Sequence, residues 1–150
     1  MRYLLDTGVL LRLRLPNDPQ YANVRDAVRK LRAERHELVI TAQNAAGFWN
    51  VSTRPTAARG GYGLSVGETD RRLKLIERLF QLLPDTPNAY PLWRELVVKR
   101  SVCGVQVHDA RLTALMEAHA VTHLLTLNPD DFKRYAQITA VTPLAVLSSP

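Results

Sequence analysis

Short apolar runs alternate with longer amphipathic stretches along the chain. The short runs have the length of buried strands and lie at residues 3–5, 38–40, 82–84, 123–127 and 138–141. Between them apolar residues recur at helical spacing, which predicts helices over residues 7–14, 20–32, 42–52, 65–81, 90–99 and 108–120. Strands that alternate with helices form βαβ units and pair in a parallel sheet. The pattern therefore predicts the α/β class, with a central parallel sheet flanked by helices.

Polar residues at the starts of two predicted helices have the chemistry of helix caps. Thr41 precedes the helix over residues 42–52, and a hydroxyl at that position accepts a backbone hydrogen bond. Ser65 and Glu68 have the spacing of a capping box. The helix that they begin is expected to turn an apolar side, Leu79 included, toward the core. Residues 54–63 contain a proline and several glycines and are predicted to form a flexible loop.

The length and composition fit one globular domain over residues 1–150. A chain of 150 residues with 46% hydrophobic and 23% charged residues can bury a sizeable core. One cysteine, Cys103, excludes an internal disulfide framework and a Cys-rich zinc site. No apolar run has the length of a membrane span, and Asp6 interrupts the first run before a signal peptide can form. We therefore expect a cytoplasmic protein that does not associate with membranes.

The net charge of the chain indicates which partners it could bind. Twenty Lys and Arg against fourteen Asp and Glu leave a charge of +6. A basic domain binds nucleic acid because its cations displace the counterions of the phosphates. The same charge also suits an acidic protein partner.

Carboxylates and related polar side chains follow two of the predicted strands and open one of the predicted helices. Asp6 ends the first strand, Asp109 opens the helix over residues 108–120, and Asn128, Asp130 and Asp131 follow the strand over residues 123–127. The carboxyl ends of parallel strands meet at one edge, where ligands bind. Clustered carboxylates need a cation or a shared proton, and oxygen ligands suit Mg²⁺ or Mn²⁺. The same spacing also fits a structure without a metal site. In that case Asp6 is a helix cap, Asp109 is a solvated residue in a first helical turn, and Asp130 and Asp131 are turn residues.

Four short motifs then add a family resemblance. They are Leu4-Leu5-Asp6-Thr7-Gly8-Val9-Leu10, Ile40-Thr41-Ala42-Gln43 through Phe48-Trp49-Asn50, Val107-His108-Asp109-Ala110-Arg111-Leu112, and Leu125-Thr126-Leu127-Asn128-Pro129-Asp130-Asp131-Phe132. In this order they resemble the PIN-domain proteins, and most closely the VapC-type toxins of bacterial toxin–antitoxin pairs. The match covers nearly the whole chain.

The resemblance implies a PIN fold and an endoribonuclease that depends on Mg²⁺ or Mn²⁺. It implies that Asp6 and Asp109 are metal ligands and that Asp131 is a further catalytic acid, although many relatives carry an acid at the position of Asn128. Thr126 would hydrogen-bond a metal-bound water. The partners implied are RNA (tRNA, rRNA or mRNA), a VapB-like antitoxin that inhibits the enzyme, and a second copy of the chain in a homodimer.

Two positions depart from the family pattern. The family usually has Asn at the position of Gly8, and it usually has Glu immediately before the aromatic residue Phe48, where this chain has Gly47. Glycine inside a helix costs about 1 kcal/mol relative to alanine, so helix stability does not account for Gly47. The loss of that carboxylate should weaken metal binding and remove a group that orients the attacking water.

Basic residues supply candidates for contacts with RNA. Arg54 and Arg59 lie in the glycine-rich loop, and Lys133 and Arg134 come after the acids. Both pairs are placed to contact phosphates, while an exposed loop with solubilising charge is an equally simple interpretation of the first pair.

Three functions are therefore compared. The first is a VapC-like ribonuclease toxin with catalytic residues Asp6, Asp109 and Asp131. The second, suggested by Gly47, is an inactive PIN-fold protein that binds RNA or an antitoxin. The third is a phosphatase with Asp6 as nucleophile, but haloacid-dehalogenase-like enzymes carry a second Asp where this chain has Gly8.

Overall fold

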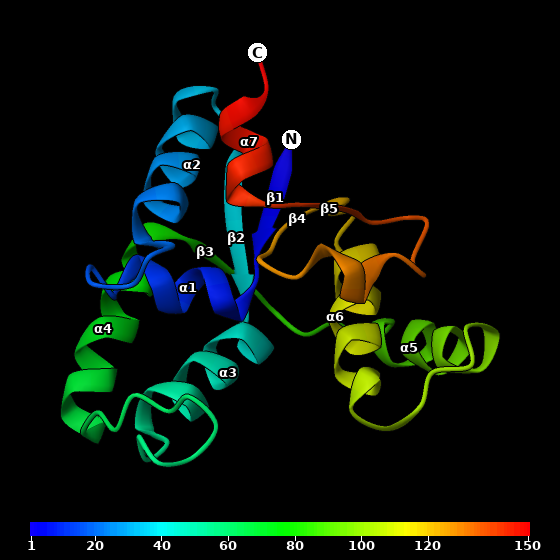
Figure 1. Cartoon of the computed structure of the whole chain (residues 1–150). Helices are drawn as coiled ribbons and strands as arrows, with labels where there is room; N and C mark the ends of the chain where they lie inside the picture. Colours follow the sequence, from blue (N-terminus) through cyan, green and yellow to red (C-terminus); the bar gives the residue numbers. More distant parts are fainter.

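Five parallel strands form the centre of the computed structural model, which describes residues 1–150 (Figure 1). Their order across the sheet is β3-β2-β1-β4-β5. The strands are β1 (Arg2–Leu5), β2 (Glu37–Thr41), β3 (Gln81–Leu83), β4 (His123–Leu125) and β5 (Thr139–Val141). Leu4 pairs with Val39 of β2 and Leu124 of β4, so fully buried apolar residues lie in the middle of the sheet. The predicted parallel sheet is confirmed.

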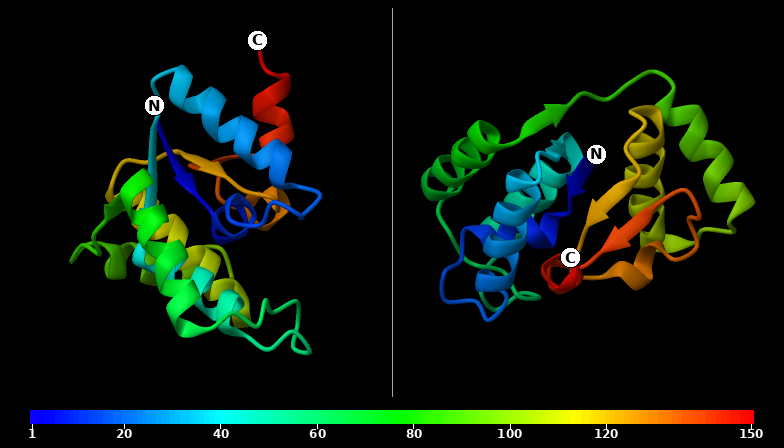
Figure 2. Two further views of the ribbon diagram at one scale, coloured as in Figure 1. Left: turned by 90° about the vertical axis from the view of Figure 1, so that its left-hand side faces the viewer. Right: turned by 90° about the horizontal axis from the view of Figure 1, so that it is seen from above.

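Seven α-helices and two short 3-10 helices connect and cover the strands. The α-helices are α1 (Thr7–Leu13), α2 (Tyr21–Ala33), α3 (Ala42–Thr53), α4 (Val66–Leu79), α5 (Ala89–Lys99), α6 (Val107–Ala118) and α7 (Pro143–Ser148). The 3-10 helices are η1 (Gly104–Gln106) and η2 (Pro129–Phe132). Figure 2 shows α2 and α7 on one side of the sheet and α5 and α6 on the other. No helix combines the length and the apolarity that a membrane span requires.

Alternation along each central strand supplies two cores, one on each face of the sheet. Leu5 and Ile40 pack into a core with Val9, Phe48 and Ile76 from the helices on their side. The neighbouring residues on the same strands, among them Leu4 and Val39, point the other way and pack with residues of α5 and α6. Because successive side chains on a strand face opposite ways, short fully apolar strands are what a sheet covered on both faces requires.

The cap predictions are confirmed in one case and partly wrong in the other. Thr41 accepts a hydrogen bond from the Asn44 backbone, and the Asn44 side chain accepts one from the Thr41 backbone, which forms a complete capping box. Ser65 caps α4 through the Glu68 backbone. The Glu68 carboxylate, however, binds Arg71 and Arg72 one turn further along the helix, because an ion pair at this spacing competes with the box. Leu79, expected in the core, is 46% exposed.

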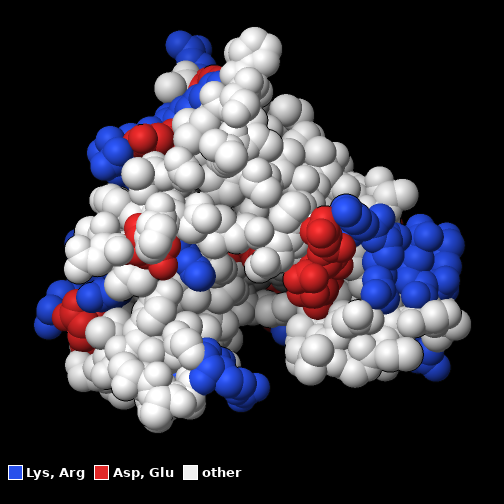
Figure 3. Space-filling model, in the orientation of Figure 1, with Lys and Arg blue, Asp and Glu red and all other residues white.

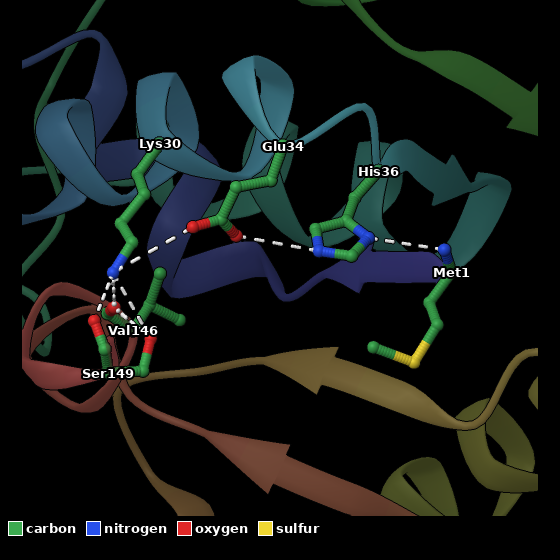
Figure 4. A network of polar contacts seen from close by, with 6 residues as sticks. All are labelled: Met1, Lys30, Glu34, His36, Val146 and Ser149. Carbon is green, nitrogen blue, oxygen red and sulfur yellow. Dashed lines mark hydrogen bonds and ion pairs between the residues drawn. The ribbon is translucent and has the colours of Figure 1, made fainter.

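The C-terminal helix α7 has no counterpart among the predicted elements. Figure 4 shows how it is attached: Lys30 of α2 donates hydrogen bonds to the carbonyl oxygens of Val146, at 3.0 Å, and of Ser149, at 2.5 Å. Lys30 also lies 3.8 Å from Glu34, whose carboxylate faces His36. The last turn of α7 therefore has its free carbonyl groups satisfied by a side chain of another helix, which its own sequence does not reveal.

Candidate active site

Three acidic side chains reach the carboxyl edge of the sheet from separate segments. Asp6 follows β1 and caps α1, Asp109 lies in the first turn of α6, and Asp131 lies in η2, which comes after β4. The charge of Asp131 raises the pKa of both Asp6 and Asp109, and the charge of Asp6 also raises the pKa of Asp109. The fold thus brings together the three acids expected from the sequence.

Asp6 is held in a fixed orientation by two hydrogen bonds. Its Oδ1 accepts from the Thr7 backbone at 2.8 Å and its Oδ2 from the Thr126 hydroxyl at 2.7 Å. Burial raises the pKa of Asp6, the two hydrogen bonds lower it, and the charge of Asp131 raises it further. Thr126 is fully buried and its hydroxyl also accepts from the Asn128 backbone. Its proton therefore lies on the hydrogen bond to Asp6, and its role is to position Asp6.

Asp109 is partly buried, and its surroundings disfavour its ionised form. Burial, followed by the negative charges of Asp131 and Asp6, raises the pKa of Asp109 to about 6. The helical wheel of α6 points Asp109 away from the apolar stripe at Ala110, as a solvated residue would point. Asp109 is instead partly buried, and the carboxylates of Asp131 in η2 and of Asp6 after β1 are close enough for their charges to act on it.

No cation neutralises these acids within the chain. Asp6, Asp109 and Asp131 take part in no ion pair, whereas the neighbouring Asp130 pairs with Lys133 at 2.7 Å. Arg134 is close enough for its charge to lower the pKa of Asp109 but makes no ion pair. In Figure 3 acidic side chains over the η2 segment lie beside a broad basic patch, and the surface is hollowed next to them. The arrangement is an uncompensated negative site with a basic rim.

The donor set fits a hard divalent cation. All three side chains offer carboxylate oxygens, the ligands that Mg²⁺ and Mn²⁺ prefer. No three Asp, Glu, His or Cys side chains approach closely enough to bind one ion together. An Mg²⁺ ion characteristically uses one or two carboxylates and keeps several waters, so the site suits an ion held by part of the acid set with water completing its shell.

Gly47 lies where α3 passes α1. A Cβ atom at position 47 would come within 2.7 Å of the Thr7 Oγ1 and 3.0 Å of the Thr7 Cγ2. Thr7 is the first residue of α1 and directly follows Asp6. The glycine therefore has a packing reason that the helix sequence alone did not supply, and Thr7 fills the space into which a side chain at position 47 would extend.

Gln43 and Arg111 form a polar link that sequence reasoning did not single out. Gln43 Nε2 donates to the carbonyl of His108 at 2.8 Å, and Arg111 donates to Gln43 Oε1 at 3.3 Å. Gln43 comes two residues after the end of β2. Ligands of a parallel sheet bind outside the carboxyl ends of its strands. This rule could have identified Gln43 from the sequence, because Gln43 follows β2 at the same edge of the sheet as the acids.

The predicted RNA contacts fall into two separate groups. Lys133 and Arg134 directly follow η2 and border the acids. Arg54 and Arg59 lie beyond the far end of α3, which runs about 18 Å at the usual helical rise. Within the loop that carries this pair, Gly63 donates to the Arg54 carbonyl at 2.8 Å and the Arg54 guanidinium donates to the Arg59 carbonyl at 3.0 Å. The fold does not bring this pair to the acids.

Comparisons with known proteins agree on one family. The model of the PIN domain matches residues 3–138. No sequence among the curated proteins matches the chain directly.

Solved structures resemble the chain over nearly its whole length. A chain in the structure of VapBC2 from Rickettsia felis, bound to a DNA fragment from its promoter, superposes with a TM-score of 0.69 and 16% identity over 95% of this chain and 98% of that one. A chain of VapBC-1 from nontypeable Haemophilus influenzae gives 0.66 and 15% over 96% and 99%. A chain of FitAcB from Neisseria gonorrhoeae gives 0.65 and 20% over 95% and 98%. At these identities the likeness establishes the fold.

Proposed function

The chain belongs to the PIN-domain family, and we propose that it is a Mg²⁺- or Mn²⁺-dependent endoribonuclease that serves as the toxin of a toxin–antitoxin pair. PIN domains are nucleases that bind divalent metal ions, which supports the reaction class. The observation that carries the proposal is the group formed by Asp6, Asp109 and Asp131, which has no cation of its own and whose repulsion contributes to raising the pKa of Asp109 to about 6. Such a group is stabilised by a divalent ion.

Asp6 and Asp109 would hold the ion, and Asp131 would be the further acid. When bound, the ion would lower the pKa of a water and neutralise the charge that develops on a phosphodiester. Thr126 and the Thr7 backbone keep both oxygens of Asp6 in place through their hydrogen bonds. Asp109 must lose its proton before it acts as a ligand, so cleavage is expected to fall below about pH 6, where its carboxyl is protonated.

Basic side chains would bind the RNA backbone beside the acids. Lys133 and Arg134 border the site, and Arg134 makes no ion pair that phosphate would have to displace. Arg54 and Arg59 would extend this contact only for a long substrate, since they lie about one helix length away. The RNA class (tRNA, rRNA or mRNA) stays open.

A VapB-like antitoxin is the proposed protein partner. The similar structures include complexes named VapBC and a toxin–antitoxin complex from Klebsiella pneumoniae. Three acids without a counter-charge form a site into which a partner can insert a basic side chain, with a gain that is larger because Asp6 and Asp109 are partly buried. A homodimer and a cytoplasmic location belong to the same proposal.

A second function is favoured by Gly47. Without a carboxylate at that position the site has one metal ligand fewer than the family pattern, and Thr7 fills the adjacent space. The alternative is therefore a PIN-fold protein that binds RNA or an antitoxin without cleavage.

Cleavage of a pooled tRNA and rRNA substrate by antitoxin-free protein, with and without Mn²⁺, separates the two functions. Asp6→Asn is the test variant. Asp130→Asn is the matched control. It also removes one negative charge, but from an exposed residue of η2 that pairs with Lys133. Cleavage that requires Mn²⁺ and Asp6 but not Asp130 supports the nuclease. Intact RNA refutes it and leaves the binding function, and cleavage that survives Asp6→Asn shows that another site or a contaminant is responsible.

A further inference from the structure

A cavity lies between α5 and α6, beside the segment that connects β3 to α5. Its volume is about 390 Å³, within the range of small-molecule sites. Tyr90 and Trp93 of α5, Arg111 of α6, and Asp85 and Thr86 of the connection contribute to its walls. None of the three acids lines it, and it combines apolar walls with a few polar groups, as ligand sites do.

Two aromatic rings form one wall. The centroids of Tyr90 and Trp93 lie 5.8 Å apart with an interplanar angle of 36°. The Trp93 indole is fixed by a hydrogen bond from Nε1 to the Val107 carbonyl at 3.1 Å. Tyr90 is 67% exposed, and Trp93 is the aromatic ring that packs against it. An exposed ring beside a fixed one offers a face on which a flat group can stack.

The polar groups of the cavity have unused hydrogen-bonding capacity. The Thr86 hydroxyl is shielded from water but has no hydrogen-bond partner, which is a cost that a ligand can relieve. Asp85 and Arg111 form a loose ion pair at 3.7 Å, with about half of each side chain exposed. The Asp85 carboxylate therefore has lone pairs left to accept from an amino group, and Arg111 has N–H groups beyond its bond to Gln43 that can contact a phosphate.

The cavity lies on the same sheet edge as the acids. All strands are parallel, so the residues after β3, β2 and β1 follow one another along the carboxyl edge. Asp85 follows β3, Gln43 follows β2 and Asp6 follows β1. Gln43 contacts Arg111 on one side and the His108 carbonyl, next to Asp109, on the other. A polymer bound at the acids can therefore reach the cavity by passing Gln43, which lies between them.

We propose that this cavity binds one nucleobase of the RNA substrate, a base that carries an exocyclic amino group and lies near the cleaved bond. The base stacks on Tyr90 and Trp93, its amino group donates to Asp85, and Arg111 contacts the adjoining phosphate. The proposal rests on the proposed ribonuclease function and adds a determinant of sequence preference. Uracil is disfavoured because it presents a carbonyl where cytosine presents the amino group, and a carboxylate repels a carbonyl oxygen.

Binding of short RNA in the absence of metal tests the cavity without cleavage. Oligo(C) and oligo(U) form a matched pair, since the amino group is replaced by a carbonyl. The chain has two tryptophans, so Trp49→Phe leaves Trp93 as the only tryptophan, and quenching of its fluorescence reports on the cavity. In this background oligo(C) is expected to bind at least ~5-fold more tightly than oligo(U).

Three variants separate the contacts. Tyr90→Ala should weaken the binding of both oligonucleotides by roughly 5- to 150-fold through lost stacking. Asp85→Asn should reduce the ratio of the affinity for oligo(C) to the affinity for oligo(U). The ratio is the readout because the loss of a negative charge strengthens the binding of both oligonucleotides. Thr86→Val should leave folding intact, since its hydroxyl has no partner in the free protein. Val98→Ala is the control for Tyr90→Ala, because Val98 lies on the same helix and is 66% exposed.

Each outcome decides for or against the cavity. Equal affinities for the two oligonucleotides, or Tyr90→Ala that binds RNA like the Val98→Ala control, overturns the proposal. A Tyr90→Ala variant that changes only self-association in sedimentation assigns the cavity to a protein partner and also overturns it. Absence of Mn²⁺-dependent cleavage together with the expected fluorescence pattern refutes the nuclease function and keeps the base site. Normal cleavage without the fluorescence pattern does the reverse.

Discussion

The contact between Thr7 and Gly47 predicts that these two positions are energetically coupled. An alanine Cβ at position 47 would lie 2.7 Å from the Thr7 Oγ1 and 3.0 Å from the Thr7 Cγ2. The three staggered positions on a threonine Cβ carry two heavy atoms and one hydrogen. Since two of these positions face Gly47, every rotamer of Thr7 leaves a heavy atom facing the new methyl group.

The expected size of the effect follows from two opposing contributions. Replacement of a helical glycine by alanine stabilises a protein by about 0.5–1 kcal/mol, whereas overpacking costs about 1–3 kcal/mol. Gly47→Ala should therefore be neutral or lower the free energy of unfolding by up to about 2 kcal/mol. Gly67→Ala is the control, because a Cβ at that helical position meets no atom within 4 Å, and it should be stabilising.

A double-mutant cycle with Thr7→Ala isolates the contact. That background removes the two closest contacts, with the Thr7 Oγ1 and Cγ2, and leaves the Thr7 Cβ at an ordinary contact distance of 3.4 Å, so Gly47→Ala should become stabilising like the control. The coupling energy from urea unfolding should be about 1–3 kcal/mol, and each kcal/mol should move the melting temperature by roughly 2–4 °C. Additivity within about 0.5 kcal/mol would show that the helices do not pack as described.

Two further predictions concern the acids. Thr126→Val removes the hydrogen bond to Asp6 and should weaken Mn²⁺ binding by about 10- to 100-fold in calorimetric titration; an unchanged affinity would contradict the positioning role of Thr126. Because the pKa of Asp109 is raised to about 6, the folded metal-free protein binds more protons than the unfolded chain between about pH 4 and 6, so its stability falls as pH rises through that window. Asp109→Asn should therefore raise the free energy of unfolding near neutral pH by about 1–2 kcal/mol after allowance for solvent screening, and a lower urea midpoint for this variant would count against it.

Features that depend on local pattern were predictable from the sequence. The apolar runs placed all five strands, and Thr41 correctly marked the start of α3. The prediction failed where a second segment decides the outcome. Glu68 binds two arginines instead of completing its capping box, and α7 depends on Lys30 of another helix. Local propensity does not contain either contact.

The candidate site shows the same division. The rule on parallel strands places Asp6, Asp109 and Asp131 at one edge from the sequence alone, and their electrostatic coupling agrees with it. The environment of Asp109 was not predictable, because η2, which lies beyond β4 in the sequence, supplies the charge that acts on it. The reason for Gly47 was hidden too, since Thr7 belongs to a different helix.

We expect the residue at position 47 to set the balance between the proposed cation binding and the proposed RNA binding at this edge. The charges of Asp131 and Asp6 already raise the pKa of Asp109, and another carboxylate beside Thr7 would strengthen the repulsion in the metal-free site. Its absence makes the site less attractive to Mn²⁺ and less repulsive to a phosphate. The two proposed functions thus lie on one scale that the charge at position 47 controls. Gly47→Glu combined with Thr7→Ala, which provides the space, should lower the Mn²⁺ concentration needed for cleavage and weaken metal-free RNA binding, and a variant in which both affinities rise together would contradict this electrostatic account.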